Sequence, residues 1–280
     1  MISVIGLGTG ASNIASLFKE HSQYSVHCLD DKVKRTSKYK FRLKAAETPE
    51  ECENNIPDLS GFFENVEDHV QFFVIGSTMS SNYSLGVLEQ LRGKKVDLFY
   101  IKPDTELLSG LARLMENTVF GVLQQYARSG LLNSITLISN LKIEETLQNI
   151  PVKQYYKSLN SLIQSSVHYM NYFDHNEPEL GVTTTPSETC RIRTMGMVDM
   201  QKLQEKWFFE LDIPREVCYY LCINEERLTK DGSLHKQYVD ILKEKPRNAF
   251  RNVSYAIYET PAGRDFGFCV ARTNAIQENT

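Results

Sequence analysis

The chain has 280 residues, of which 41% are hydrophobic and 24% are charged, and its formal net charge is −4. This composition is typical of a folded globular protein with one large or two ordinary domains. The negative net charge excludes a global attraction to nucleic acid or to acidic membranes, and no apolar run approaches the roughly 20 residues of a membrane span. We therefore expect a cytoplasmic protein without a membrane span, and nucleic acid as a partner only through an adaptor.

The first 18 residues, MISVIGLGTGASNIASLF, predict a strand, a tight glycine turn and the start of a helix. Glycine tolerates positive φ, and the first backbone N–H groups of a helix lack partners at the positive end of its dipole. An anion, most often a nucleotide phosphate, is therefore expected near Gly6, Gly8 and Gly10. The alternative is that these glycines only allow a close strand–helix crossing.

A second strand, at residues 24–30, ends in Asp30. The segment from Gly6 to Ala11 fits GxGxxG/A, and an acid about 20 residues later completes the dinucleotide-binding pattern. An NAD-dependent oxidoreductase is therefore an alternative hypothesis. Against it, the six histidines are dispersed, and each is interpreted as a surface or capping residue rather than a general base.

The most conspicuous charged run is basic and lies between residues 32 and 44. Such runs are mostly solvated surface, and a dedicated polyanion-binding role is the lesser alternative. The cations of this run are Lys32, Lys34, Arg35, Lys38, Lys40, Arg42 and Lys44.

Strands and helices alternate through the first half of the chain, which indicates a parallel, doubly wound sheet. Further strands are predicted at 70–76, 95–101 and 134–139, and helices at 50–55, 85–91 and 105–129. A long helix follows at 152–173, with an apolar stripe at spacings of three and four.

A smaller mixed α/β region follows a loop at 177–189. Its predicted strands are 191–198, 217–223, 253–258 and 266–272, around a helix at 233–243. We predict a nucleotide-binding Rossmann-like domain (1–151), a central helix (152–176) and a C-terminal mixed domain (177–280) that ends in a tail from residue 274. The six cysteines form no CxxC pair, so buried free thiols are expected and a metal site is not.

This order of parts resembles the tubulin/FtsZ family of GTP-dependent filament proteins. VIGLGTGASN is similar to the FtsZ opening VIGxGGGGxN, with Asn13 in place after the glycines. Thr48-Pro49-Glu50 resembles the Asn-Pro-Glu near the γ-phosphate, and Gly110-x-x-Arg113 resembles the Gly-x-x-Arg of the ribose loop. Tyr156 and Asn160 fall where the family places an aromatic ring on guanine and an Asn that hydrogen-bonds the base.

Two stretches depart from the family pattern. The sequence STMSSNY at 77–83 replaces the glycine-rich phosphate loop GGGTGTG, so hydroxyl donors are added while side chains occupy space beside the phosphate. After the long helix, Glu188 and Arg191 stand within the region of the family's Asn-x-Asp-x-x-Asp. A cation cannot act as a general base. Glu188, Glu177 or Glu179 could take over this role in the longer loop, and Glu188 is the candidate catalytic residue.

The resemblance implies binding of GTP or GDP, with Mg²⁺ where hydrolysis is retained, and head-to-tail assembly of identical subunits into filaments. GTPase activity is expected only if the Glu188 loop is functional. The alternative is a degenerate, non-hydrolysing homologue that acts as a structural or partner-binding protein. The residues expected at the nucleotide are Gly6, Gly8, Thr9, Gly10, Asn13, Thr48, Ser77, Thr78, Ser80, Arg113, Tyr156 and Asn160.

Overall fold

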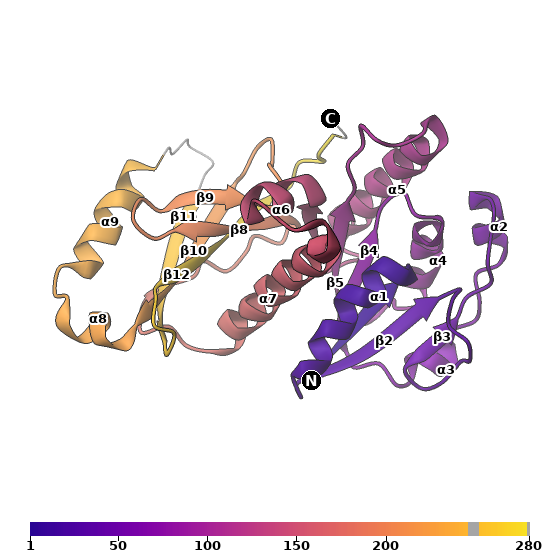
Figure 1. Cartoon of the computed structure of the whole chain (residues 1–280), viewed down its shortest axis with the longest axis horizontal. Coiled ribbons are helices and arrows are strands. Elements are labelled where there is room, and N and C mark those ends of the chain that lie inside the picture. Colours follow the sequence, from indigo (N-terminus) through magenta and orange to yellow (C-terminus); the bar gives the residue numbers. More distant parts are fainter. Residues whose placement is uncertain (246–251, 279–280) are drawn as a thin grey trace. The chain divides into compact units, whose positions relative to one another are not determined.

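The computed structural model describes residues 1–245 and 252–278, and Figure 1 shows the course of the chain. These residues form two compact units. The first runs from Met1 to Ser165 and takes in the C-terminal residues from Ile276, and the second runs from Ser166 to Ala275. No helix among the described residues is both long and apolar enough to span a membrane.

The first unit is built on a parallel sheet with the strand order β3-β2-β1-β4-β5-β6. The predicted doubly wound sheet is therefore confirmed. Its strands are β1 (Ile2–Leu7), β2 (Tyr24–Asp30), β3 (Lys40–Arg42), β4 (His69–Ile75), β5 (Lys95–Lys102) and β6 (Ser134–Ser139).

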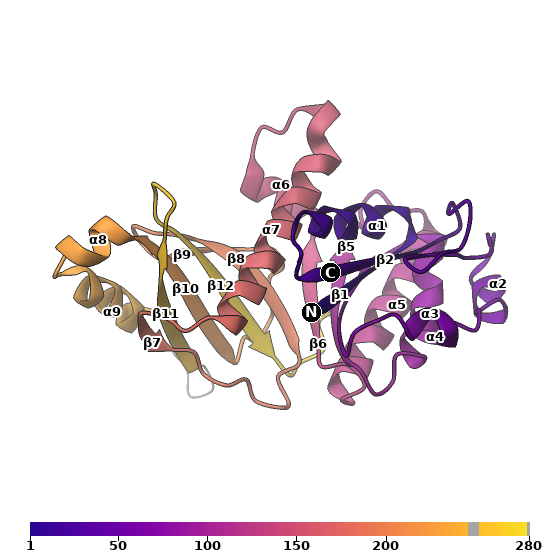
Figure 2. The same cartoon turned by 90° about the horizontal axis from the view of Figure 1, so that it is seen from below.

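Helices cover both faces of this sheet, with α1 on one face and α4 and α5 on the other (Figure 2). Phe73 of β4 stacks on Phe99 of β5 at 4.7 Å between ring centroids, and Phe18 packs against Tyr24 at 5.0 Å. The helices are α1 (Gly8–Leu17), α2 (Pro49–Asn54), α3 (Ser60–Phe63), α4 (Ser84–Glu89), α5 (Gly110–Arg128) and α6 (Asn140–Leu147), with 3₁₀ turns η1 (Phe18–Glu20), η2 (Met79–Tyr83) and η3 (Val152–Gln154).

Helix α7 (Tyr155–His175) is the predicted long helix, and its apolar stripe is buried as expected. Leu159 and Ile163 lie in the part that belongs to the first unit, and Val167 and Phe173 in the part that belongs to the second. The helix starts three residues later than predicted, because Val152–Gln154 form a 3₁₀ turn after Pro151.

The second unit is a mixed sheet with the strand order β8-β12-β10-β11-β7, and β9 pairs with β8. Strands β10 and β11 are parallel, whereas the other pairs are antiparallel. The bounds are β7 (Leu180–Val182), β8 (Ile192–Asp199), β9 (Gln204–Trp207), β10 (Glu216–Asn224), β11 (Asn252–Thr260), β12 (Phe266–Thr273), α8 (Glu225–Lys230) and α9 (Leu234–Glu244).

Successive side chains of strand β10 point to opposite faces of the sheet, and the side chains on both faces are buried. Tyr219 and Leu221 pack in one core with Tyr238 of α9. On the other face, Tyr220 stacks on Phe173 of α7 at 4.7 Å between ring centroids. The sequence thus folds a small mixed domain around one central strand.

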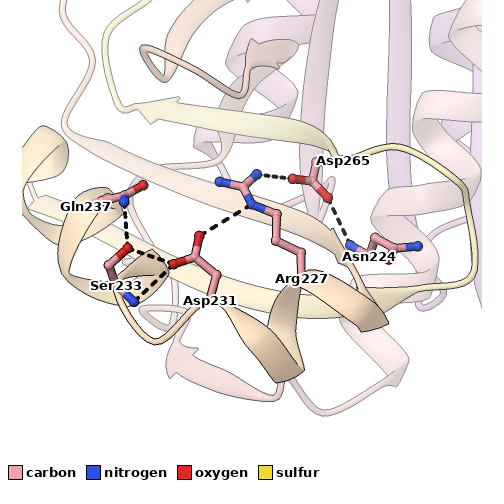
Figure 3. Close-up of polar contacts among 6 residues, drawn as sticks. All are labelled: Asn224, Arg227, Asp231, Ser233, Gln237 and Asp265. Atoms are coloured by element: carbon pink, nitrogen blue, oxygen red, sulfur yellow. Dashed lines mark hydrogen bonds and ion pairs between the residues drawn. The ribbon is translucent and has the colours of Figure 1, made fainter.

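A polar network joins α8 and α9 to the turn between β11 and β12 (Figure 3). Arg227 forms an ion pair with Asp265 and lies 3.7 Å from Asp231. Asp265 also accepts a hydrogen bond from the Asn224 N–H at 2.9 Å, and Asp231 accepts one from Ser233 Oγ at 2.7 Å. The network fixes the start of both helices, which is a structural role.

Two sequence-based expectations are wrong in detail. Helix α5 begins at Gly110 rather than at residue 105, because the Ser109 side chain accepts a hydrogen bond from the Ala112 N–H and caps the helix there. The predicted tail is ordered to Gln277, which is 2% exposed. Its N–H donates to Gln124 Oε1 at 2.8 Å, so Gln277 packs on α5. Residues 279–280 of the predicted tail lie outside the described residues.

One histidine is a core residue rather than the expected surface or capping residue. His27 of β2 is 0% exposed, its ring contacts Phe62 at 5.6 Å between centroids, and its Nε2 lies 3.0 Å from Ser25 Oγ. Burial, together with the positive charge of Lys38, lowers the pKa of His27 to about 4. The imidazole is therefore neutral in the folded protein at neutral pH.

The buried His27 should make the protein less stable in mild acid. An unfolded chain binds a proton at this residue below pH 6.5, whereas the folded chain does so only near pH 4. The free energy of unfolding should fall by about 2 kcal/mol from this residue between pH 7 and pH 5. Urea unfolding at both values checks this, and His27→Phe should show a correspondingly smaller pH dependence; an equal dependence in both proteins would rule the effect out.

Candidate functional site

A pocket of about 280 Å³ lies in the first unit where three neighbouring parallel strands end. Leu7 ends β1, Asp30 ends β2 and Ile75 ends β4, and all three line the pocket. The carboxyl ends of parallel strands are where α/β folds bind ligands. The expected site residues that line this pocket are Gly8, Thr9, Gly10, Thr78 and Ser80.

The N-terminus of α1 faces this pocket. Residues 8–11, which form the first turn of the helix, all line it, and the N-cap Leu7 offers no side-chain hydrogen bond. The first N–H groups of a helix have no intrahelical acceptor and lie at the positive end of the dipole. Gly8 has a φ of +80°, a conformation that favours glycine. This geometry suits an anion, as the glycine turn predicts.

The loop after β4 forms another wall of the pocket with side chains in place of glycines. Thr78 Oγ1 donates to the Ile75 carbonyl at 2.9 Å and lies 3.3 Å from Ser80 Oγ. Ser80 rests against the glycine turn, since a Cβ placed on Gly8 would lie 2.1 Å from Ser80 Oγ. The expectation that these side chains occupy space beside a bound phosphate stays a prediction. A bound anion has to approach α1 next to a hydroxyl group.

A buried carboxylate supports this loop from the other side of the sheet. Glu116 of α5 is 0% exposed, and Tyr100 Oη donates a hydrogen bond to its Oε2 at 2.7 Å. Gly76 leaves room for this pair, because a Cβ there would lie 1.9 Å from Glu116 Oε2. The backbone N–H of the next residue, Ser77, lowers the pKa of the same carboxyl group, and Ser77 has a φ of +54°. Among the described residues, Glu116 Oε1 has no hydrogen-bond partner. The carboxylate therefore lies beside a left-handed turn that carries a serine.

The ionisation of Glu116 is set by opposing effects. Burial raises its pKa, although the Tyr100 hydrogen bond and the positive charge of Lys102 favour the ionised form. Burial also lowers the pKa of Lys102, which the Glu116 charge partly offsets. The buried acid and its neighbours therefore depend on one another for their protonation states.

Two adjacent carboxylates also line the pocket. Asp30 is buried at the end of β2, where the dinucleotide pattern expects an acid, and Asp31 beside it is exposed. A hydrogen bond with Asp30 raises the pKa of Asp31. Lys32 and Lys44 line the pocket as well and balance this negative charge. In the described residues, no group of three or more His, Cys, Asp and Glu side chains could hold a metal ion.

Other expected site residues lie outside the lining of this pocket. Gly6 is buried beneath α1, and Asn13 lines a neighbouring groove. Thr48 accepts a hydrogen bond from the Glu51 N–H at 3.2 Å and caps α2. Arg113 donates to the Thr105 carbonyl at 2.9 Å, within its own loop.

The expected purine clamp lies at the start of α7. Tyr156 is 74% exposed, with its ring at 5.2 Å and nearly perpendicular to that of Tyr155, and Asn160 is half-buried one turn further along. The spacing of four places both side chains on one face of the helix. Neither lines the pocket at α1, so their role in base recognition stays a prediction.

Glu188 belongs to the exposed loop between β7 and β8 in the second unit. The loop is held on either side of this residue: the Ser187 N–H donates to Glu216 Oε1 at 3.0 Å, and Ser187 Oγ lies 3.0 Å from Thr189 Oγ1. The carboxylate itself is open to solvent. Its role as the catalytic residue stays a prediction.

The similarity of this chain to known proteins is found in its structure rather than in its sequence. No family model and no curated protein matches this sequence. A GTPγS-form protofilament of TubZ from Bacillus thuringiensis serovar israelensis has a TM-score of 0.73 at 14% identity, covering 97% of this chain and 86% of that one. FtsZ from M. jannaschii (TM-score 0.68, 11% identity, 97% and 88% covered) and CetZ from Methanosaeta thermophila (0.68, 11%, 98% and 86%) are also similar. The chain therefore has a tubulin/FtsZ-like fold, which confirms the resemblance seen in the sequence.

Proposed function

We propose that this chain is a tubulin/FtsZ-like cytoskeletal protein that binds GTP or GDP at the N-terminus of α1 and assembles head to tail into filaments. The observation that carries the proposal is the uncapped first turn of α1, which opens on a pocket at the ends of β1, β2 and β4. The fold supports the guanine nucleotide over NAD, because the similar solved structures are of TubZ, FtsZ and CetZ.

The residues of the pocket fit a phosphate group. The N–H groups of residues 8–11 offer donors, and the hydroxyl group of Thr9 can add a further one. Lys32 and Lys44 supply positive charge. Asp30 and its neighbouring carboxylate would repel a bare phosphate, which favours a nucleotide carried as its Mg²⁺ complex.

The other end of the nucleotide is assigned from the family resemblance. In this proposal Tyr156 stacks on the base, Asn160 hydrogen-bonds its edge, and Arg113 faces the ribose. Asn13 and Thr48 complete the phosphate end. These roles require Arg113 and Thr48 to exchange their present hydrogen bonds, with the Thr105 carbonyl and the Glu51 N–H, for contacts with the ligand.

Assembly would place the Glu188 loop of one subunit against the nucleotide of the next. A head-to-tail contact of this kind does not close on itself, so it propagates a filament. Solved structures of TubZ include a two-stranded filament with a TM-score of 0.70 to this chain. Glu188 is the proposed catalytic acid, because it is the exposed carboxylate closest in sequence to the cation Arg191 that replaces the last acid of the family motif.

A non-hydrolysing filament or partner-binding protein is the second candidate. It is favoured by the loop at 77–83, where Thr78, Ser80 and Ser81 already hydrogen-bond within the loop. Hydroxyl groups engaged in this way offer less to a reacting phosphate than free backbone donors do. In this candidate the nucleotide, if bound, has a structural role only.

Charge reversal at Glu188 should abolish GTP-dependent pelleting of the protein. The wild type should sediment in the presence of GTP, whereas Glu188→Lys should stay in the supernatant, because the lysine would repel cations bound with the neighbouring nucleotide. Glu225→Lys reverses the charge of an exposed residue at the start of α8; it serves as the matched control and should pellet normally. Pelleting of Glu188→Lys at the wild-type level would refute the head-to-tail arrangement.

A further inference from the structure

Charge is sharply segregated in the first unit. Residues 32–44 hold seven cations and no acid, and we name them the basic segment. Residues 45–68 hold eight acids and no Lys or Arg, and we name them the acidic segment. All fifteen charged side chains are exposed. The acids are Glu47, Glu50, Glu51, Glu53, Asp58, Glu64, Glu67 and Asp68.

The basic segment forms one wall of a groove of about 580 Å³ beside α1 and β2. Ser12, Asn13 and Ser16 of α1 also line this groove, and Asp30 is the carboxylate among the lining residues. In the described chain, none of the groove's cations has an ion-pair partner within 4 Å. These cations are Lys19, Lys32, Lys34, Arg35 and Lys40.

Protection of a sheet edge explains only part of this pattern. Strand β3 is the edge strand of the first unit, and lysines commonly prevent edge strands from pairing with other chains. Lys40 and Arg42 lie on that strand. Lys19, Lys34 and Arg35 do not, and a groove that gathers five cations is not needed for edge protection.

The acidic segment lies at the same edge of this unit. Phe62 of α3 contacts Phe41 of β3 at 5.7 Å between ring centroids, and Figure 1 shows α3 beside β3, with α2 on the same side of the unit but apart from β3. The two segments do not neutralise each other: among the described residues no ion pair joins them, and Asp68 pairs with Lys94 instead. Complementary charges therefore remain available to another molecule.

We propose that the basic segment of one copy of this chain binds the acidic segment of a second copy. Charge complementarity selects this occupant, because every copy carries both surfaces. A nucleic-acid backbone is disfavoured, since the acidic segment would repel it along the same edge and the chain has a net charge of −4. The contact does not involve the Glu188 loop and needs no nucleotide, although Lys32 and Lys44 of the basic segment also line the pocket at α1.

Two arrangements satisfy this pairing. Because both segments lie at one edge, two copies related by a twofold axis can make the basic–acidic contact twice. Alternatively, successive copies can each make it once. In both arrangements the contact joins exposed charges, so it should weaken as salt screens them over distances of about 10 Å at 0.1 M.

Sedimentation velocity without nucleotide tests the proposal. Wild type should self-associate at about 50 mM salt and become monomeric at about 500 mM. Lys34→Glu/Arg35→Glu and Glu50→Lys/Glu53→Lys should each associate at least about tenfold more weakly, because each brings like charges together. Their equimolar mixture should recover association, since a contact between the two variants again pairs opposite charges at the reversed positions. Circular dichroism confirms that both variants fold.

Lys202→Glu/Lys236→Glu, a reversal of two exposed lysines in the second unit, is the matched control and should associate like the wild type. Monomeric wild type at low salt, or a mixture that fails to associate, would overturn the proposal. If only the basic-segment variant lost association, the proposal would also be overturned. The basic segment would then bind a different anion, such as nucleic acid carried through purification.

Discussion

Replacing Glu116 with alanine should lower the free energy of unfolding by about 3 to 4 kcal/mol. The substitution leaves a cavity, removes the acceptor of the buried Tyr100 hydroxyl, and deprives Lys102 of a nearby opposite charge. It also removes the negative charge that the Ser77 N–H stabilises beside the left-handed turn after β4. Urea unfolding at neutral pH measures the loss.

Two further variants separate the causes of this loss. Glu116→Gln keeps the volume and an acceptor for Tyr100, so it should cost less than the alanine variant. Tyr100→Phe removes only the donor and should cost about 1 to 2 kcal/mol. A Glu116→Ala protein within about 0.5 kcal/mol of the wild type would mean that the carboxylate does not support the loop.

Replacing Gly6 with alanine should destabilise the protein by about 3 kcal/mol. A Cβ at this position would lie 2.5 Å from the Ser12 Cα and 2.7 Å from the Ala11 carbonyl carbon. Both are backbone atoms, so α1 itself would have to move away from β1. The first turn of α1 would then shift at the pocket, and nucleotide affinity should fall with stability.

Gly61→Ala is the matched control for this effect. A Cβ on Gly61 would meet nothing within 4 Å, so this variant should be as stable as the wild type or slightly more stable. Thermal unfolding of both variants makes the comparison. Equal melting temperatures for the two variants would show that a Cβ at the close crossing of β1 and α1 does not destabilise the protein.

The sequence allowed two interpretations of the glycine turn, a close strand–helix crossing and an anion site, and the structure supports a separate glycine for each. Gly6 permits the close crossing of strand and helix, whereas Gly8 has positive φ and lines the pocket. Sequence alone could predict both uses, because each follows from the absence of a Cβ. It could not assign them to particular glycines, since that depends on which atoms lie opposite in the folded chain.

The parallel sheet and the buried stripe of α7 were predictable from local patterns. Apolar runs separated by amphipathic segments define the strand–helix alternation, and spacings of three and four define the stripe at Leu159 and Ile163. Short elements such as β3 and α6 were missed, because a three-residue strand and an eight-residue polar helix have too little periodicity to detect.

The support of the loop by Glu116 was not predictable in the same way. A glutamate in an amphipathic helix normally indicates the solvent-facing side, and its burial depends on Tyr100 and Gly76 from two other elements. His27 was misread for a related reason, since its burial comes from Phe62, 35 positions away along the chain. Contacts between distant segments decide both cases.

The central claim is that a guanine nucleotide binds at the N-terminus of α1 and reaches the start of α7. Calorimetric titration of nucleotide-free protein with GTP tests it most directly, with ATP and NAD as competing ligands and Asn160→Ala beside the wild type. We predict micromolar binding of GTP, weaker binding of ATP and NAD, and a loss of at least about tenfold in GTP affinity in the variant. Absence of GTP binding, or preferential binding of NAD, would contradict the account.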